Sequence, residues 1–233
     1  MPCVIDSTVE LPARQGSDFP RRRRAQTALV ILDLDDSSQE RIDLPVRVAR
    51  ALKDECPLSG DRDAVVSSIR SIEERVCFAV LVDALSRRDH SSRELEEKLS
   101  LQGYRSPCVH HAIERAKDAR FLDDTRFARY FIEERKRRGW GRMRIERDLR
   151  TRGIDPSLLL PGYPEEFFDF DDDLERALMV LGRKAIPATN PYPKLMRFLM
   201  GKGFSASIAS DAVKRVLYAD GDEAGTYGDM QSF

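Results

Sequence analysis

The chain has 233 residues, of which 41% are apolar and 34% are charged, and its formal net charge is −1. Because it contains no run of about 18 apolar residues, we expect no membrane span, and the N-terminus lacks the apolar stretch of a signal peptide. Four cysteines without a CxxC pair indicate reduced thiols and a cytoplasmic location in such a chain.

The first 60 residues contain few helix signals. The run Arg21–Arg24 is interpreted either as part of a solvated tail or as a phosphate-binding tail. The apolar segment at 27–34 is rich in β-forming residues, and turn residues and an alternation of Ile42 with Leu44 follow it. We therefore predict a small N-terminal extension that contains a β-hairpin.

An apolar-x3-apolar-x3-Gly-apolar pattern occurs three times, and its copies begin at Leu95, Ile145 and Leu195. Each copy predicts a short helix with an apolar pair at i and i+4, a glycine at its end and an apolar residue that returns to the core. Because one copy has too small an apolar face to fold alone, neighbouring copies are expected to stack. The sequence thus predicts a mainly α fold of tandem three-helix repeats in an elongated, curved array.

Helix signals set the expected boundaries of the repeats. A long helix is predicted from about residue 61 to 88, and the next begins with a capping box formed by Ser91 and Glu94. The first helix of the third repeat is expected from Leu174. The predicted divisions are a flexible basic arm (1–25), an N-terminal extension (26–60), three-helix repeat 1 (61–118), three-helix repeat 2 (119–162), an acidic linker (163–172), three-helix repeat 3 (173–218) and a flexible tail (219–233).

Repeat 2 concentrates basic charge between Arg126 and Arg152, where eleven Lys or Arg face four acids and give 11 − 4 = +7. Such a stretch suits phosphates or an acidic protein surface, although Arg-rich helix faces are also commonly solvated. Tyr130 and Trp140 stand among these charges, where an exposed ring stacks on bases or anchors an interface. An alternative interpretation makes Trp140 a core residue between two helices. The candidate contact residues are Arg87, Arg88, Arg93, Arg126, Arg129, Arg135, Lys136, Arg137, Arg138, Arg142, Arg144 and Arg147.

Signals for catalysis are absent from the sequence. It has no P-loop, GxSxG or HExxH motif. The acids between 169 and 173 lie close together in one short segment and do not converge as metal-supported catalysis requires. Asp123 and Asp124 are interpreted as helix caps, and the three histidines lack zinc-site spacing. We therefore expect no enzyme, no cofactor and no metal site.

Three segments carry a resemblance to a known family: RRDHS at 87–91, LDDTRFA at 122–128 and GWGRMRIERDLRTRGI at 139–154. Over about residues 77–218 the chain resembles the RecX family of recombination regulators. The resemblance implies a non-enzymatic modulator that binds the RecA recombinase, above all its filament on single-stranded DNA. It also implies inhibition of ATP hydrolysis, strand exchange and co-protease activity, and so a role in homologous recombination, DNA repair and the SOS response.

A second function class stays open beside that resemblance. The basic helix predicted at 141–152 also fits a helix-turn-helix DNA-binding protein, in which one short helix enters the major groove. Sequence-specific binding would distinguish that class, because a filament regulator is expected to contact DNA without regard to sequence. For the regulator we expect a monomer that has no membrane partner.

Overall fold

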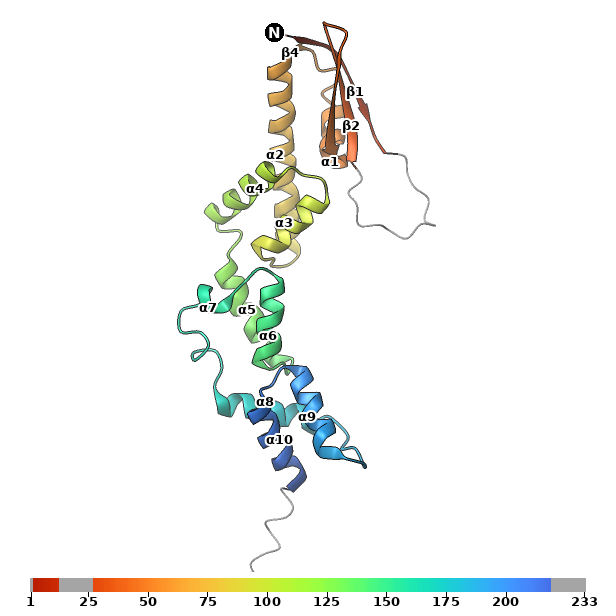
Figure 1. The fold of residues 1–233 in the computed structure, drawn as a ribbon. Coiled ribbons are helices and arrows are strands. Elements are labelled where there is room, and N and C mark those ends of the chain that lie inside the picture. Colours follow the sequence, from red (N-terminus) through yellow and green to blue (C-terminus); the bar gives the residue numbers. More distant parts are fainter. Residues whose placement is uncertain (1, 13–26, 219–233) are drawn as a thin grey trace, which may run out of the picture. The chain divides into compact units, whose positions relative to one another are not determined.

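The computed structural model describes residues 2–12 and 27–218 (Figure 1). The chain divides into two compact units, and the first ends at Asp124. Within the described ranges, ten helices accompany four strands, which form one antiparallel sheet near the N-terminus. The predicted mainly α class is confirmed.

The sheet contains β1 (Cys3–Glu10), β2 (Thr27–Leu34), β3 (Gln39–Pro45) and β4 (Gly60–Asp61) in the order β3-β2-β1-β4. The predicted hairpin is confirmed as β2 and β3. The prediction of a flexible arm over residues 1–25 is wrong for β1. A register shift between Val4 and Asp6 breaks the period of two in that strand, so that its buried residues are Val4 and Ser7. The run Arg21–Arg24 lies outside the described residues.

The core of the first unit lies between the sheet and the helices. Helix α1 (Val46–Lys53) lies beside β2, where Val48 and Leu52 are buried (Figure 1). Helix α2 (Arg62–Arg87) begins at the N-cap Asp61, whose side chain accepts a hydrogen bond from Ala64 N at 3.1 Å. It contacts α1 and β1, and it also contacts α3 and α4, so one helix belongs to both the extension and the first repeat.

Helices α3 (Ser92–Leu101) and α4 (Ser106–Asp118) complete the first repeat. The predicted cap is confirmed, because Ser91 Oγ accepts the N–H of Glu94 at 3.2 Å. The apolar pair of α3 is buried as its spacing predicts. A buried carboxylate, that of Glu73 on α2, accepts bonds from Arg105 N at 3.2 Å and from Arg105 Nε at 2.7 Å. It thereby joins the start of α4 to α2.

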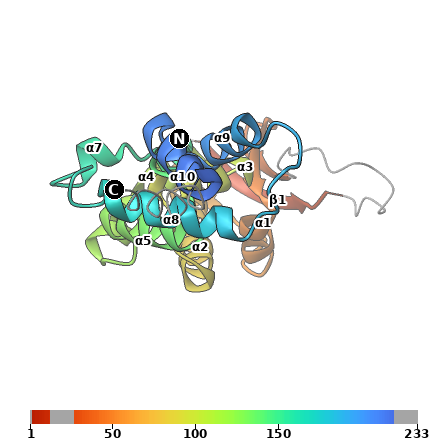
Figure 2. The ribbon, with the colours of Figure 1, turned by 90° about the horizontal axis from the view of Figure 1, so that it is seen from below.

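The second unit contains the other two repeats. Its helices are α5 (Asp124–Arg137), α6 (Arg142–Thr151), α7 (Pro156–Leu159), α8 (Phe170–Gly182), α9 (Pro191–Lys202) and α10 (Ala206–Tyr218). The apolar pairs of α6 and α9 are fully buried, and α8 packs against α10 (Figure 2). Helix α8 begins earlier than expected, because Asp169 caps it and accepts the N–H of Asp171 at 2.9 Å. Residues expected in an acidic linker thus form its cap and first turn, where negative charge is favourable.

Repeat 2 has an interrupted third helix. Helix α7 has four residues, whereas α4 and α10, which lie at the corresponding places in repeats 1 and 3, have 13 each. Pro161, Gly162 and Pro164 prevent the helix from continuing. Residues 161–168, here called the aromatic turn, instead place Tyr163, Phe167 and Phe168 in the hydrophobic cluster of this repeat.

Candidate partner-binding surface

The basic side chains of repeat 2 differ in what they contact, and one group stacks on aromatic rings. The guanidinium carbon of Arg144 lies 3.8 Å from the centroid of Trp140, and that of Arg135 lies 4.6 Å from it. Arg135 is also 4.6 Å from the centroid of Phe131, and Arg152 is 4.9 Å from the same ring. These five side chains, here called the stacked cluster, alternate arginine with aromatic residue. A desolvated cation–π contact contributes about 2 kcal/mol.

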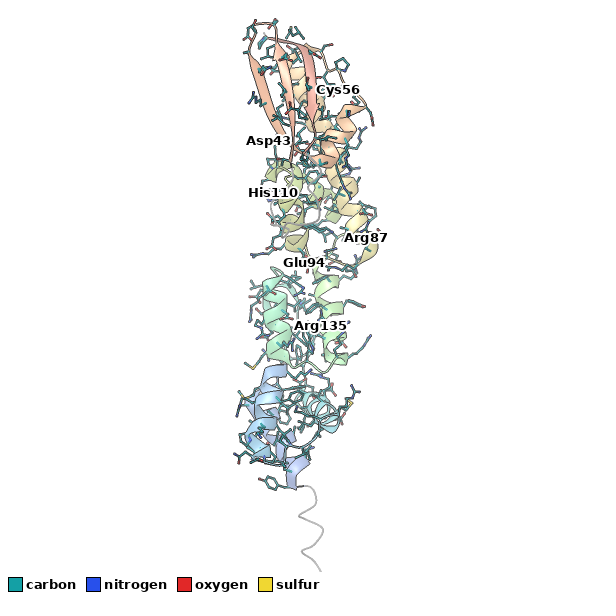
Figure 3. The ribbon with its side chains drawn as sticks, turned by 90° about the vertical axis from the view of Figure 1, so that its right-hand side faces the viewer. Asp43, Cys56, Arg87, Glu94, His110 and Arg135 are labelled. Atoms are coloured by element: carbon teal, nitrogen blue, oxygen red, sulfur yellow. The ribbon has the colours of Figure 1, made fainter. Side chains whose placement is uncertain are left out.

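Because of these ring contacts, two of the candidate contact residues, Arg135 and Arg144, are partly buried. The Nε atoms of Arg135 and Arg144 are buried and have no hydrogen-bond partner among the described residues. Trp140 is half-buried and packs against the hydrophobic cluster of repeat 2. The structure therefore supports the interpretation of Trp140 as a core residue. Arg135 and Arg144 contribute to the packing around this ring. Figure 3 labels Arg135 on the second unit.

A second group of basic residues forms ion pairs within the unit. Arg142 Nε lies 2.6 Å from Glu146 Oε1, and Arg138 pairs with Glu134 one turn before it. Lys136 Nζ donates to the carbonyl oxygen of Phe167 at 2.8 Å and lies 3.5 Å from Glu133. Lys136 therefore fastens the aromatic turn to α5.

The remaining candidates of this repeat point outward. Arg126, Arg129, Arg137 and Arg147 are exposed. The Arg147 Nε lies 3.8 Å from its acidic neighbour, at the long end of an ion pair, and Arg129 rests 5.2 Å from the ring centroid of Phe167. These side chains have the accessible charge that an acidic partner or a phosphate needs.

The first unit places its three candidates at the junction of α2 and α3. Arg87 pairs with Asp83 at 3.1 Å, Arg88 with Glu94 at 3.1 Å, and Arg93 with Glu97 at 2.9 Å. Figure 3 shows Arg87 and Glu94 at this end of the unit. All three arginines are more than half exposed. Because exposed ion pairs contribute about 1 kcal/mol or less, these guanidinium groups remain available to a stronger anionic partner.

Two further predictions from the sequence have definite outcomes in the structure. Tyr130 is 61% exposed on α5, as a ring that meets a partner should be. Asp124 is the first residue of its helix, and its carboxylate accepts bonds from Ser92 N at 2.8 Å and Ser92 Oγ at 2.6 Å. The Asp124 carboxylate therefore connects α5 to the start of α3. The sequence prediction of Asp124 as a helix cap did not include this contact.

Comparison with known proteins decides the family. The model described as "RecX, first three-helix domain" matches residues 77–115, and "RecX, second three-helix domain" matches residues 123–159. Regulatory protein RecX of Vibrio vulnificus (strain CMCP6) is 30% identical over 150 residues, which are 64% of this chain and 93% of that relative. The chain belongs to the RecX family.

Other relatives agree with this assignment. Regulatory protein RecX of Halorhodospira halophila (strain DSM 244 / SL1) is 34% identical over 151 residues, which cover 62% of this chain and 89% of the relative. A crystal structure of regulatory protein RecX shares the fold with a TM-score of 0.52 at 16% identity, covering 92% of this chain and 98% of the other. That of RecX from Lactobacillus salivarius has the same TM-score and identity and covers 63% and 97%. Because the relatives are named regulatory proteins, the family indicates a regulatory role.

The candidate contact residues all lie within the segments that the two RecX family models match. The first model covers the second half of α2 with α3 and most of α4, and the second covers α5 to α7. No helix among the described residues of this RecX family member is long and apolar enough to cross a membrane.

The aromatic turn adds residues that sequence reasoning missed. Tyr163 Oη donates to Glu146 Oε1 at 2.9 Å, and the guanidinium of Arg142 lies 5.8 Å from the Tyr163 ring. Burial raises the pKa of the Tyr163 hydroxyl, and its bond to Glu146 raises that pKa further. The available signal was a pair of prolines with three aromatic residues at the place of a third helix. In this RecX family member the turn holds Arg129, Lys136 and Arg142 against its rings and backbone.

Proposed function

We propose that this protein is a negative regulator that binds the RecA recombinase and its filament on single-stranded DNA. In this role it inhibits ATP hydrolysis, strand exchange and co-protease activity, and so restrains homologous recombination, DNA repair and the SOS response. Membership of the RecX family, whose members are named regulatory proteins, is the observation that carries the proposal.

The outward basic residues support this role physically. Arg129, Arg137 and Arg147 are exposed, whereas Arg135 and Arg144 stack on Trp140 and Arg142 pairs with Glu146. Such residues suit an acidic surface of a protein filament or its DNA backbone. A DNA contact of this kind is independent of sequence, because phosphates carry no base information. The proposed regulator acts as a monomer in the cytoplasm, where its partner resides.

The helix-turn-helix alternative meets an obstacle in the geometry of α6. A recognition helix contacts base edges with its N-terminal residues. Here the N–H of Gly141 donates to Lys202 O at 2.9 Å, and the N–H of Met143 donates to Gly203 O at 3.0 Å. The α9–α10 junction therefore covers the N-terminus of α6. This observation favours the regulator over a protein that reads the major groove with α6.

The decisive experiment measures the single-strand-dependent ATP hydrolysis of RecA while this protein is titrated in at two salt concentrations. We expect inhibition at fewer than one molecule per RecA protomer, and we expect it to weaken at higher salt because the contacts are ionic. Absence of inhibition at both salt concentrations contradicts the proposal. If the protein then binds duplex DNA with a sequence preference, the helix-turn-helix function replaces it.

A further inference from the structure

Two cysteines from different helices meet in the core of the first unit. Cys77 on α2 is fully buried, and Cys108 on α4 is 4% exposed. Helices α2 and α4 pack against each other (Figure 1), and a side-chain hydrogen bond joins the two thiols. The two residues are far apart in the sequence and form no CxxC motif, so folding alone brings them together.

Ordinary packing explains each cysteine but not the pair. A buried cysteine commonly serves as a small apolar residue, and a thiol in apolar surroundings is usually inert. Here two nucleophilic sulfur atoms are in direct contact within one hydrophobic cluster. Two sulfur atoms in such contact need a small movement to reach the S–S bond length of about 2.05 Å. The pair therefore has the arrangement from which a disulfide forms.

A cavity leads from the surface to Cys108. Its volume is about 170 Å³, and Cys108, Arg75 and His111 are among the residues that line it. The side chains of Arg75 and His111 are 68% and 64% exposed, so the cavity opens to solvent beside them. Cys77 is not a lining residue of this cavity. A small reagent that enters from solvent therefore meets Cys108 first.

The cavity admits a small neutral oxidant. One water molecule needs about 10–15 Å³ of such a volume, so hydrogen peroxide, which is little larger, fits as well. Glu74 also lines the cavity and lies 3.5 Å from His111. Because hydrogen peroxide is uncharged, this carboxylate does not repel it.

The hydrogen bond between the thiols gives them different roles. This bond raises the pKa of Cys77, and burial raises that pKa further, so Cys77 keeps its proton. A proton that Cys77 directs at the Cys108 sulfur stabilises negative charge there. Cys108 also lies in the first turn of α4, where free N–H groups favour negative charge. Because the thiolate is the nucleophile in thiol chemistry, Cys108 is the sulfur that attacks an oxidant.

We propose that Cys77 and Cys108 form a dithiol site that a hydroperoxide, such as hydrogen peroxide, oxidises to a disulfide. The Cys108 sulfur attacks one peroxide oxygen, the O–O bond breaks, and the other oxygen leaves as water with the proton of the Cys108 thiol. The Cys77 sulfur then attacks the Cys108 sulfenic acid, so that the S–S bond forms and the S–O bond breaks. That oxygen leaves as water with the Cys77 proton. Two electrons pass from the thiols to one peroxide, which becomes two water molecules.

The disulfide joins α4 covalently to α2. It closes a loop of about 30 residues and so lowers the entropy of the unfolded chain. Oxidation should therefore stabilise the first unit. In the proposed cytoplasmic location, cellular thiols reduce such a bond again, so the site responds reversibly to oxidant.

Peptide mapping of the full chain tests the site. Cys3→Ala/Cys56→Ala leaves Cys77 and Cys108 as the only thiols in the chain. This variant is treated with hydrogen peroxide, the remaining thiols are alkylated in denaturant, and tryptic peptides are identified by mass spectrometry. We expect one disulfide within a single chain that joins peptides 76–87 and 106–115 and that dithiothreitol breaks. Recovery of both cysteines as alkylated thiols, or disulfides only between two chains, overturns the inference.

Single substitutions in the same background test the assigned roles. Cys77→Ala should leave Cys108 as a sulfenic acid that dimedone labels. Cys108→Ala should leave Cys77 to react with peroxide at least about tenfold more slowly, because it is buried away from the cavity and keeps its proton. Circular dichroism establishes that each variant is folded. Equal rates for the two cysteines overturn the roles, and the mapping experiment remains decisive if either variant does not fold.

Urea provides the matched control for folded geometry. At low protein concentration the folded parent chain should form the disulfide between Cys77 and Cys108 in preference to other pairs, whereas the chain in concentrated urea should give a mixture. The same mixture from the folded chain contradicts the proposal.

Thermal unfolding measures the effect of the bond. The oxidised Cys3→Ala/Cys56→Ala variant should unfold about 5–15 °C above its reduced form, and dithiothreitol should remove the difference. A lower midpoint after oxidation overturns the inference, because the disulfide then disrupts the packing of α4 on α2.

Discussion

Gly141 and Gly203 pack backbone against backbone in the second unit. A Cβ atom built on Gly141 would lie 2.3 Å from the carbonyl carbon and oxygen of Gly203, and one built on Gly203 would lie 2.5 Å from the backbone nitrogen of Arg144. Gly203 also has a φ of +94°. Two hydrogen bonds, from Gly141 N to Lys202 O and from Met143 N to Gly203 O, depend on this close approach. The pattern glycine of repeat 3 thus fastens α6 of repeat 2 as well as ending its own helix.

Substitution of either glycine should destabilise the second unit. For Gly203→Ala we expect a loss of about 2–4 kcal/mol, from the positive φ and from the clash with Arg144. Gly141→Ala, which has only the clash, should lose about 1–3 kcal/mol. Urea unfolding followed by the fluorescence of Trp140, the only tryptophan in the chain, measures both. Gly201→Ala is the control, since its Cβ meets nothing within 4 Å in a helix, and it should be neutral or stabilising by up to about 1 kcal/mol.

The buried carboxylate of Glu73 should stabilise the first unit. Its removal in Glu73→Ala leaves the backbone N–H and guanidinium of Arg105 without their acceptor. Losing one partner of a buried ion pair costs about 3–5 kcal/mol. Because the Arg105 side chain is 46% exposed and regains water, we expect about 2–4 kcal/mol.

Circular dichroism suits the Glu73 measurement, because Trp140 lies in the other unit. The matched control is Glu74→Ala on the same helix, whose exposed side chain is 3.5 Å from His111 and should contribute less than about 1 kcal/mol. Equal effects of the two substitutions would show that the Arg105 contact does not stabilise the fold.

Local patterns predicted the parts of the fold that depend on helix periodicity. The apolar pairs of α3, α6 and α9 are buried, and Ser91 accepts a free N–H group of the helix that follows it. These features follow from residues three and four apart, whose side chains share one helix face. By contrast, β1 escaped prediction because its bulge interrupts the period of two.

The candidate site was predictable in composition but not in arrangement. The sequence shows eleven basic residues in one stretch, but their roles depend on where Phe131 and Trp140 lie after folding. Arg144 and Arg147 are three residues apart on one helix, yet the first stacks on an indole and the second is exposed. Most of the aromatic turn was likewise predicted only as part of an acidic linker (163–172), because its rings contact helices from other parts of the sequence.

The hydroxyl of Tyr163 should make the second unit sensitive to alkaline pH. Burial and the bond to Glu146 raise the pKa of this phenol above its ordinary value of about 10. Because the pKa of Tyr163 is higher in the folded state than in the unfolded state, this hydroxyl contributes its full stabilisation below about pH 10. That stabilisation is lost as the pH rises through the folded-state pKa. We therefore expect the urea midpoint to fall less steeply above pH 10 in Tyr163→Phe than in the parent chain.

At neutral pH the same substitution removes a hydrogen bond to a charged group and should cost about 1.5–3 kcal/mol, which fluorescence of Trp140 detects. Tyr130→Phe is the control, because its side chain is exposed and should leave the alkaline profile unchanged. An identical alkaline profile for Tyr163→Phe and the parent chain would contradict the assigned role of this hydroxyl.

Arg144 and Arg147 should separate folding from partner binding. Charge removal in Arg144→Met keeps an unbranched side chain but deletes the guanidinium that lies 3.8 Å from the Trp140 ring centroid. We expect a loss of about 1–2 kcal/mol and a shift in Trp140 emission, because the contact is partly desolvated. Arg147→Met should leave both the stability and the emission unchanged, since this side chain is 69% exposed and its ion pair is long.

The effects on RecA should have the opposite order. Measured where both variants are fully folded, Arg147→Met should weaken inhibition of ATP hydrolysis and reduce its salt dependence, because an outward charge is lost. Arg144→Met should inhibit like the parent chain. If Arg144→Met is fully folded and loses inhibition while Arg147→Met retains it, the stacked arginine is the contact residue. The division of the basic stretch into stacked and outward groups would then fail.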